Sequence, residues 1–373
     1  MIAILGPSPP DRGGIARETA LLAEELSRRV GVAYFTFSRR YPRWLDPRRF
    51  DVDPGLGPSP ATPILDYRSP NSWKRAAEAI AAESPSALLV PWWTGFWGLP
   101  VRVLLRWLKR RAPDTRRILL CHNVEDHEGG LLRGFLSRGA FLSADAFVVH
   151  SEQDRARLSR IAPDRPALVV PHPVAPAAVT SRAEARRRLA LDDAPLVLFL
   201  GLVRRYKGVD LLIDAAPEIV RSAGARIAVV GEVFPDAEDL SRRAAASSVR
   251  DRILWKDSYV SEEEMSVWLA ACDVVVLPYR RISGSGIAAR AFAAGRPVAA
   301  SDVGGFQDIV EPGITGERFA PGDAKALASC VATMLARPPG FYAEALARAA
   351  ERASWPRYVD ALLRFIDRGV FVS

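Results

Sequence analysis

The chain has 373 residues, of which 49% are hydrophobic and 25% charged, and this balance excludes an intrinsically disordered or collagen-like protein. The length predicts two domains, and the sequence has no run of about 18 apolar residues that would predict a membrane-spanning helix. The net charge is +8, and residues 1–180 hold 25 Lys and Arg against 18 Asp and Glu, so the first half carries most of the positive excess.

Short runs rich in leucine and β-branched residues alternate with helical patterns, which predicts α/β domains with parallel sheets covered on both faces. A looser segment from about Val174 to Ala194 separates two sets of strands, so we predict two doubly wound domains joined there. The strands predicted in chain order are 2–6, 87–91, 117–121, 146–150, 167–171, 196–201, 226–231, 273–278 and 297–301. The clearest predicted helices are 16–29, 182–189, 209–222 and 262–271.

The N-terminus and the cysteines indicate the cellular compartment. Residues 1–6 lack the basic start and long apolar stretch of a signal peptide. Cys121, Cys272 and Cys330 lie far apart, without metal or redox spacing. We therefore expect a cytoplasmic protein. Peripheral contact with the inner face of the cell membrane is compatible with this expectation.

The basic first half is the feature that bears on partners. Positive charge attracts an anionic membrane, a phosphorylated acceptor or nucleic acid, although an arginine-rich composition also produces a solvated face without a partner. Nucleic acid is not expected, because the sequence has no helix-turn-helix, finger or RNA-binding aromatic motif. Residues 101–111 are both apolar and basic with helical spacing, which predicts either a helix in a membrane interface or one that covers a sheet.

Ligands of open parallel sheets bind at the carboxyl ends of the strands, so the residues that follow each strand are the candidates. Gly13 and Gly14 open the first helix, where backbone N–H groups suit an anion, although a simple turn also explains the pair. Trp92 and Trp93 follow another strand and predict either stacking on a sugar or lipid, or packing between domains.

All four histidines lie at or near predicted strand ends: His122, His127, His150 and His172. His122 is the favoured functional histidine. A metal site is not expected, because these histidines lack an i,i+4 pair with a third ligand.

Two loops in the second half predict phosphate binding. Arg204 and Lys207 flank the start of a helix, and cations beside free helix amides make a phosphate site, whereas the alternative is a solvated basic turn. The small-residue loop 283–286 precedes another helix and offers hydroxyl and amide donors. Two such loops in one domain predict that the ligand is a nucleoside diphosphate and not a single phosphate group.

The order of these motifs resembles the retaining GT-B glycosyltransferases of family 4, or glycosyl transferase group 1. In the second half the resemblance rests on Lys207-Gly208, the loop 283–286, the G-R-P-V run at 295–298 and the run from Ser301 to Gly316. In the first half it rests on the Gly13-Gly14 loop, the blocks at 122–128 and 144–152, and Pro171-His172-Pro173. The resemblance covers nearly the whole chain.

The resemblance implies two Rossmann-like domains that face each other across a cleft. Residues 1–180, with a last helix at about 355–373 that crosses back, would bind the acceptor. Residues 181–354 would bind a nucleoside-diphosphate sugar. The implied reaction moves the sugar to a glycan, glycolipid or other lipid-linked acceptor with retention of anomeric configuration, in cell-surface polysaccharide biosynthesis.

The resemblance also implies roles for single residues. His122 would lie near the transferred sugar, and Arg204 and Lys207 would hold the diphosphate and stabilise the leaving group. The expected donor-binding residues are Gly13, Gly14, Gly201, Glu232, Tyr259, Ser283, Gly284, Ser285, Gly286, Ile287 and Arg290. The expected acceptor-binding residues are Trp92, Trp93 and His127. No cofactor or metal is expected, because no D-x-D motif follows a strand.

The sequence departs from the family pattern at two positions. The family often has two glutamates, one that contacts the donor sugar and one that contacts the ribose, where this chain has Ile282 and Arg290. The alternatives to an active transferase are therefore a non-catalytic nucleotide-sugar-binding partner protein and a GT-B sugar-nucleotide epimerase. The basic, aromatic first half favours an enzyme with an acceptor over an epimerase.

Overall fold

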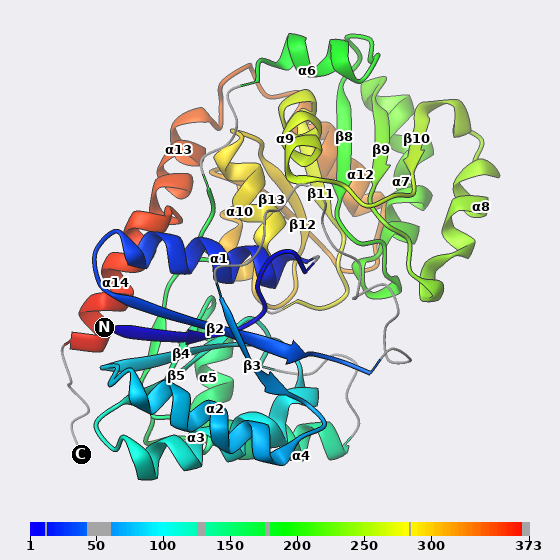
Figure 1. The fold of residues 1–373 in the computed structure, drawn as a ribbon. Coiled ribbons are helices and arrows are strands. Elements are labelled where there is room, and N and C mark those ends of the chain that lie inside the picture. Colours follow the sequence, from blue (N-terminus) through cyan, green and yellow to red (C-terminus); the bar gives the residue numbers. More distant parts are fainter. Residues whose placement is uncertain (12, 43–60, 125–130, 176–179, 283–284, 368–373) are drawn as a thin grey trace. The chain divides into compact units, whose positions relative to one another are not determined.

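A computed structural model describes residues 1–373 except 12, 43–60, 125–130, 176–179, 283–284 and 368–373. The chain divides into two compact units (Figure 1). The first contains Met1–Pro171 and Trp355–Ser373, and the second contains His172–Ser354. The N-terminal part of the first unit therefore ends at Pro171, whereas the sequence predicted the domain boundary at residue 180.

The first unit is built on a parallel sheet of seven strands in the order β3-β2-β1-β4-β5-β6-β7. In Figure 1, α1 and α14 lie on one face of this sheet, and α2, α3 and α4 lie on the other. The strands are β1 (Ile2–Leu5), β2 (Val32–Arg39), β3 (Thr62–Asp66), β4 (Ala87–Trp92), β5 (Arg116–Cys121), β6 (Ala146–Val149) and β7 (Ala167–Val169). The helices are α1 (Gly14–Ser27), α2 (Pro70–Ala82), α3 (Gly98–Arg111), α4 (Leu131–Phe141), α5 (Glu152–Ile161) and α14 (Trp355–Asp367).

The second unit is built on a sheet of six strands in the order β10-β9-β8-β11-β12-β13. Helix α7 packs against α12, α6 against α9, and α10 against α13. The strands are β8 (Leu196–Leu200), β9 (Arg226–Val230), β10 (Ile253–Lys256), β11 (Val274–Leu277), β12 (Val298–Ser301) and β13 (Gly316–Phe319). The helices are α6 (Arg182–Arg188), α7 (Val209–Ala223), α8 (Asp239–Ala245), α9 (Glu262–Ala271), α10 (Gly286–Ala293), α11 (Phe306–Ile309), α12 (Ala324–Leu335) and α13 (Ala343–Arg352).

Neighbouring strands in both sheets pair in parallel, and both sheets reverse their strand order beside the first strand. The middle strands β4, β6, β8 and β11 are buried at every residue, as their continuous apolar runs predict for a sheet covered on both faces. The predicted fold class, two doubly wound Rossmann-like α/β domains, is confirmed.

All nine predicted strands are present, and the structure describes four more that the sequence did not predict. Three of the missed strands, β3, β10 and β13, lie at an edge of their sheet. All four residues of β10 are half-buried, and β13 carries Glu317 and Arg318 in its middle. An edge strand has a solvated side, so its sequence lacks the continuous apolar run by which the central strands were recognised.

Helix α3 decides between the two alternatives for residues 101–111. Its apolar side chains Val101, Leu104, Leu105 and Leu108 are buried in the core of the first unit. The helix therefore covers the sheet, and its apolar face is not available to a membrane.

Helix α14 returns to the first unit after the second is complete. It packs against α1 and buries Trp355, Tyr358, Val359, Leu362 and Ile366. Its apolar residues recur at spacings of three and four, which places them on one face of a helix. The first core is thus completed by the last described segment of the chain.

A close backbone contact joins the loops after β8 and β11. Gly208 has φ +67, and a Cβ atom there would lie 1.9 Å from the carbonyl oxygen of Pro278. Gly224, at the other end of α7, has nearly the same φ of +62, but a Cβ there would meet nothing within 4 Å. The two glycines share a left-handed backbone and differ in whether space exists for a side chain.

We predict that Gly224→Ala lowers the free energy of unfolding by about 1 kcal/mol, the cost of a left-handed alanine. Gly208→Ala should cost about 3 kcal/mol or more, because the backbone contact must also open. Urea denaturation of both variants checks this. Equal costs for the two variants would show that the Gly208–Pro278 contact does not constrain these loops.

Candidate functional site

The second unit places its candidate residues where the strand order reverses. Strand β8 lies between β9 and β11, so the connections that follow β8 and β11 diverge at the carboxyl edge of the sheet. The loop after β8 carries Arg204 and Lys207, and the loop after β11 leads to the start of α10 at Gly286. The sequence therefore concentrates cations and helix amides at the position where doubly wound sheets bind ligands.

Arg204 is held in place by the loop that follows β9. Its Nε atom lies 3.1 Å from Oδ1 of Asp236, and its guanidinium lies 4.6 Å from the ring centroid of Phe234. Arg204 is half-buried and precedes a short 3-10 turn, Arg205–Lys207. The ion pair and the ring contact fix the direction of a side chain that would otherwise be flexible.

Lys207 is half-buried against an aromatic ring. Its Nζ atom lies 5.3 Å from the ring centroid of Tyr279, which follows β11. No carboxylate within the described residues forms an ion pair with this ammonium. Burial lowers the pKa of Lys207 to about 8, and the nearby Arg204 guanidinium adds to the decrease. An anion beside Lys207 would supply the missing counter-charge.

Glycine lines the other side of Lys207. A Cβ atom at Gly201, which has φ +116, would lie 3.6 Å from Nζ of Lys207 and 3.7 Å from a side-chain carbon of Ile287. Gly201 and Ile287 therefore lie beside the same ammonium, as two of the predicted donor-binding residues.

The start of α10 provides backbone donors. Ser285 is 5% exposed, and its hydroxyl accepts a hydrogen bond of 3.2 Å from the backbone N–H of Ala288. The first amides of a helix have no partner within it, so those of Gly286 and Ile287 are the donors that remain at this end. Ser283 and Gly284 lie outside the described residues. His172, the first residue of the second unit, lies 3.5 Å from the position of a Cβ at Gly286.

The remaining donor predictions lie around these loops. Glu232 directly follows Gly231 at the end of β9, and Tyr259 follows β10; both are half-buried. Arg290 lies on α10 and forms an ion pair with Glu262, the first residue of α9. A carboxylate therefore still lies beside the position where the family pattern has its second glutamate, although it comes from another helix.

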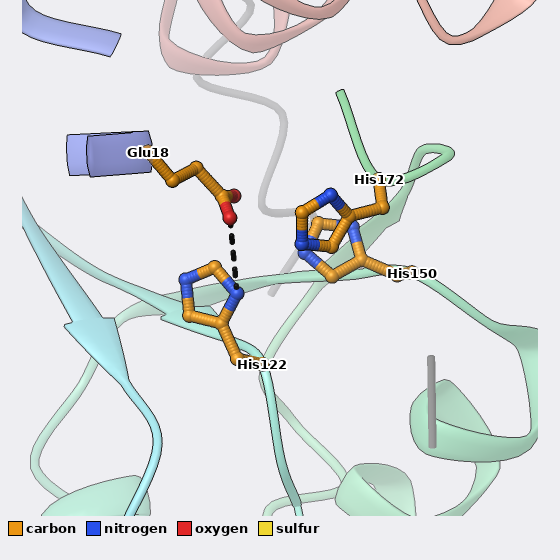
Figure 2. A group of neighbouring side chains, drawn as sticks. All are labelled: Glu18, His122, His150 and His172. Carbon is orange, nitrogen blue, oxygen red and sulfur yellow. Dashed lines mark ion pairs between the residues drawn. The ribbon is translucent and has the colours of Figure 1, made fainter. Parts of the chain in front are cut away.

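The first unit brings two of its histidines together with a carboxylate (Figure 2). His122 follows β5, and its Nδ1 atom lies 3.8 Å from Oε2 of Glu18 on α1. The rings of His122 and His150 have centroids 5.6 Å apart. His150 Nδ1 lies 3.1 Å from the carbonyl oxygen of Val170. The Glu18 carboxylate and the His122 ring therefore form a polar pair at the end of β5.

The same three side chains are the candidates for a metal ion. The ligand atoms of Glu18, His122 and His150 lie within 4.8 Å of one another. One carboxylate and two imidazoles are a set that Zn²⁺ accepts. The sequence did not predict this grouping, because Glu18 is far from both histidines along the chain.

Gly13 and Gly14 open α1 without a capping side chain. Gly13 has φ +127, and a Cβ at either glycine would meet nothing within 4 Å. The amides at the start of α1 are therefore accessible to a ligand. Glu18 lies on the second turn of this same helix.

Trp92 and Trp93, the two predicted acceptor-binding tryptophans, differ in burial. Trp92 is 2% exposed, and its ring packs against Phe141 with centroids 5.2 Å apart. We correct its predicted role in acceptor binding, because a core ring leaves no face for a sugar. Trp93 is half-buried and donates a 2.7 Å hydrogen bond from Nε1 to the hydroxyl of Tyr41. His127 lies outside the described residues.

Sequence reasoning missed three residues of these sites: Glu18, Glu262 and Tyr279. Glu18 could have been found from its place one helical turn after Gly14. Tyr279 directly follows Pro278 at a strand end, which is where ligands were expected. Nothing in the sequence connects Glu262 to Arg290, because that contact depends on how α9 and α10 pack.

Solved structures share the fold of the whole chain. A sucrose-phosphate synthase from Thermosynechococcus elongatus aligns with a TM-score of 0.72 at 23% identity and covers 99% of both chains. The Anabaena HepE protein, solved in complex with UDP, aligns with a TM-score of 0.75 at 15% identity and covers 98% of both chains. The fold is therefore GT-B, a pair of Rossmann-like domains in one chain.

A family match falls on the second unit. Residues 194–337 match the family described as Glycosyl transferases group 1. An alpha-D-kanosaminyltransferase from Streptomyces kanamyceticus is 32% identical over 157 residues, 42% of this chain and 40% of that protein. A D-inositol 3-phosphate glycosyltransferase from Xylanimonas cellulosilytica is 34% identical over 198 residues, 51% of this chain and 46% of that protein. The alignments thus span about half the length of these curated relatives.

The charge on Lys207 should destabilise the folded protein. Its pKa is about 8 when folded, below its usual value of 10.5, so the penalty is full below pH 8 and disappears as the pH rises towards 10.5. Lys207→Met, which keeps the length without the charge, is therefore expected to raise the free energy of unfolding at pH 7 by about 1–3 kcal/mol.

Urea denaturation at pH 7 and pH 10 measures this effect. The stabilising effect of Lys207→Met should shrink at the higher pH. Lys325→Met, on the exposed start of α12, is the matched control and should show no such dependence. A Lys207→Met protein that is less stable than wild type at pH 7 would contradict this account of the site.

Proposed function

We propose that this protein is a glycosyltransferase that moves a sugar from a nucleoside-diphosphate sugar to an acceptor, with retention at the anomeric carbon. The observation that carries the proposal is the Arg204–Lys207 loop. It puts two cations at the reversal of strand order, in the unit that matches Glycosyl transferases group 1. The HepE complex with UDP supports a nucleotide ligand for this fold.

The donor diphosphate would bind between the two loops of the second unit. Lys207 and Arg204 would neutralise its charge, and the amides of Gly286 and Ile287 would donate hydrogen bonds to its oxygens. As the bond between the sugar and the diphosphate breaks, negative charge increases on the leaving oxygen. Cations already fixed by Asp236 and Tyr279 stabilise that charge without rearranging, which lowers the barrier.

The leaving diphosphate would then act as the base. Its oxygen takes the proton of the acceptor hydroxyl while that hydroxyl bonds to the anomeric carbon from the same side. This side of attack produces retention. His122, with Glu18 beside it, would bind the transferred sugar and hold it in position while its bond to the diphosphate breaks.

We propose a metal-independent reaction, because Arg204 and Lys207 supply the positive charge that a divalent ion supplies elsewhere. Turnover in EDTA tests this. If EDTA abolished activity and Zn²⁺ or Mg²⁺ restored it, a bound ion would be needed for the reaction. Glu18, His122 and His150 would then be the first candidate ligands to mutate.

The acceptor is proposed to be a glycan, a glycolipid or another lipid-linked hydroxyl compound, bound by the first unit. Trp93, whose ring is half-buried, remains the aromatic candidate for stacking on it. One curated relative is named for kanosaminyl transfer and another for D-inositol 3-phosphate, so the substrates named within the group differ. A role in cell-surface polysaccharide synthesis is part of this proposal.

The first experiment is a thermal-shift panel of UDP, GDP, ADP and dTDP with their common sugars, in EDTA. A ligand that binds only the folded protein stabilises it by mass action, by about 2.7 kcal/mol at a hundred times its dissociation constant. A shift with one nucleotide identifies the donor class. A folded protein that responds to none of them contradicts donor binding.

Nucleotide binding should depend on the charge of Lys207. Because the pKa of Lys207 is about 8, affinity for UDP, or for the nucleotide that the panel selects, should fall as the pH rises above 8. The fall should be up to about tenfold per pH unit. Lys207→Arg should remove this dependence, because arginine stays charged. Lys207→Ala should slow turnover by raising its activation free energy by about 2–4 kcal/mol. Titration calorimetry from pH 7 to 9.5 measures the affinities; the same pH profile in Lys207→Arg would exclude Lys207 as its cause.

His122→Ala should reduce turnover far more than nucleotide affinity, because the proposed role of His122 concerns the transferred sugar. A fall of about a hundredfold in kcat with an unchanged dissociation constant for the nucleotide is expected. His122→Gln keeps most of the volume and separates this effect from a packing defect. Parallel losses of binding and turnover would count against the role.

A non-catalytic partner protein is the second candidate, since Ile282 and Arg290 replace the glutamates of the family pattern. Ile282 is 8% exposed and packs in the core of the second unit, so it offers the donor no polar contact. Nucleotide binding without turnover on any acceptor would favour this candidate. Conversion of a bound nucleotide sugar to its epimer, without an acceptor, would favour an epimerase.

A further inference from the structure

A basic hollow lies in the first unit, away from the carboxyl ends of its strands. Its volume is about 380 Å³, and it lies between α3, α4 and the residues that precede β7. Six of its ten lining residues are basic and none is acidic: Arg102, Arg106, Lys109, Arg117, Arg138 and Arg165. Arg117 is the second residue of β5 and Arg165 precedes β7, so the hollow lies at the amino edge of the sheet. His122 and Gly14 lie at the opposite edge.

The charges of the hollow are largely uncompensated. Arg117 is bound by Asp145, with Nε 2.7 Å from Oδ2. The other five cations have no ion pair within the part of the chain that the structure describes. Asp114 and Asp164 border a neighbouring hollow and are exposed. Five like charges around one concavity repel each other, and a polyvalent anion would relieve that repulsion.

The helices explain how these cations gather. Arg102, Arg106 and Lys109 recur at spacings of four and three on α3, which places them on one face of the helix. Helix α4 approaches that face at Gly139, where a Cβ would lie 3.0 Å from the Arg102 side chain. The apolar face of α3 is buried, so its cations are directed outward by the packing itself.

Two exposed apolar side chains border the same hollow. Phe135 is 66% exposed and Leu142 is 49% exposed, and both belong to the small set of large hydrophobic residues that the described surface exposes strongly. A soluble phosphate compound gains nothing from such neighbours. The interface of a bilayer accepts apolar side chains and offers phosphate groups at the same depth.

We propose that this hollow binds the phosphate of an anionic lipid headgroup, with Phe135 and Leu142 inserted between neighbouring lipids. Arg102, Arg106 and Arg138 would form charge-assisted hydrogen bonds to the phosphate oxygens. The hollow belongs to the first unit and the proposed donor site to the second, and the proposal does not depend on the proposed transferase activity.

The test is sedimentation of the full chain with vesicles of phosphatidylcholine alone and with 30% phosphatidylglycerol. The anionic vesicles should bind the protein, and about 0.5 M NaCl should release it, because salt at that concentration screens the attraction between exposed charges. Arg106→Gln/Arg138→Gln should lower the partition coefficient roughly thirtyfold.

The matched control removes two exposed arginines from elsewhere in the same unit. Arg160→Gln on α5 and Arg364→Gln on α14 change the net charge equally and should lower the partition coefficient much less. Equal losses in the two double variants would overturn the proposal, because the effect would then reflect net charge. Thermal melts of both variants establish that they are folded.

A second pair of substitutions distinguishes a lipid headgroup from free phosphate as the ligand of the hollow. Phe135→Ser/Leu142→Ser keeps every cation and should still weaken vesicle binding by about tenfold. Titration with inorganic phosphate alone is the other arm. Phosphate binding that needs Arg106 and Arg138, together with no binding to anionic vesicles, would overturn the assignment to a lipid.

Discussion

The reversal of strand order beside β8 is the constraint on which the rest of the second unit depends. Because β9 and β11 flank β8, the chain leaves β8 and β11 towards opposite faces, and their loops part above the sheet. The loops are nevertheless held together below that point, where Gly208 meets Pro278 and the backbone N–H of Arg280 donates to the carbonyl oxygen of Tyr206. These contacts fix the two loops relative to each other, and the loops carry Lys207 and lead to the start of α10.

This geometry explains why Lys207 is both unfavourable and useful. Burial and the nearby Arg204 guanidinium both disfavour the charged form of Lys207, so its ammonium costs stability. The same arrangement favours an anionic ligand, because Arg204 is paired with Asp236 whereas Lys207 has no ion pair within the described residues. Stability and binding are therefore opposed at one residue, which is common where charge has been concentrated for function.

The sequence predicted the fold well where burial is complete and less well where it is partial. Central strands such as β4 and β8 are recognisable because both of their faces are covered, so nearly every residue must be apolar. Edge strands such as β13 lack that requirement. The candidate loops were found because they directly follow recognisable strands. The Glu18–His122 contact was not found, because it depends on the distance between α1 and β5 across the folded unit.

Helix α14 has a consequence for the order of synthesis. It contributes Trp355, Tyr358 and Leu362 to the first unit, but it is translated only after the whole second unit. At ribosomal rates of about 5–20 residues per second, the nascent first unit waits roughly 10–40 seconds for this helix. During that interval, the face of α1 that α14 will cover is exposed on the ribosome, while the second unit, which is continuous in sequence, can fold without delay.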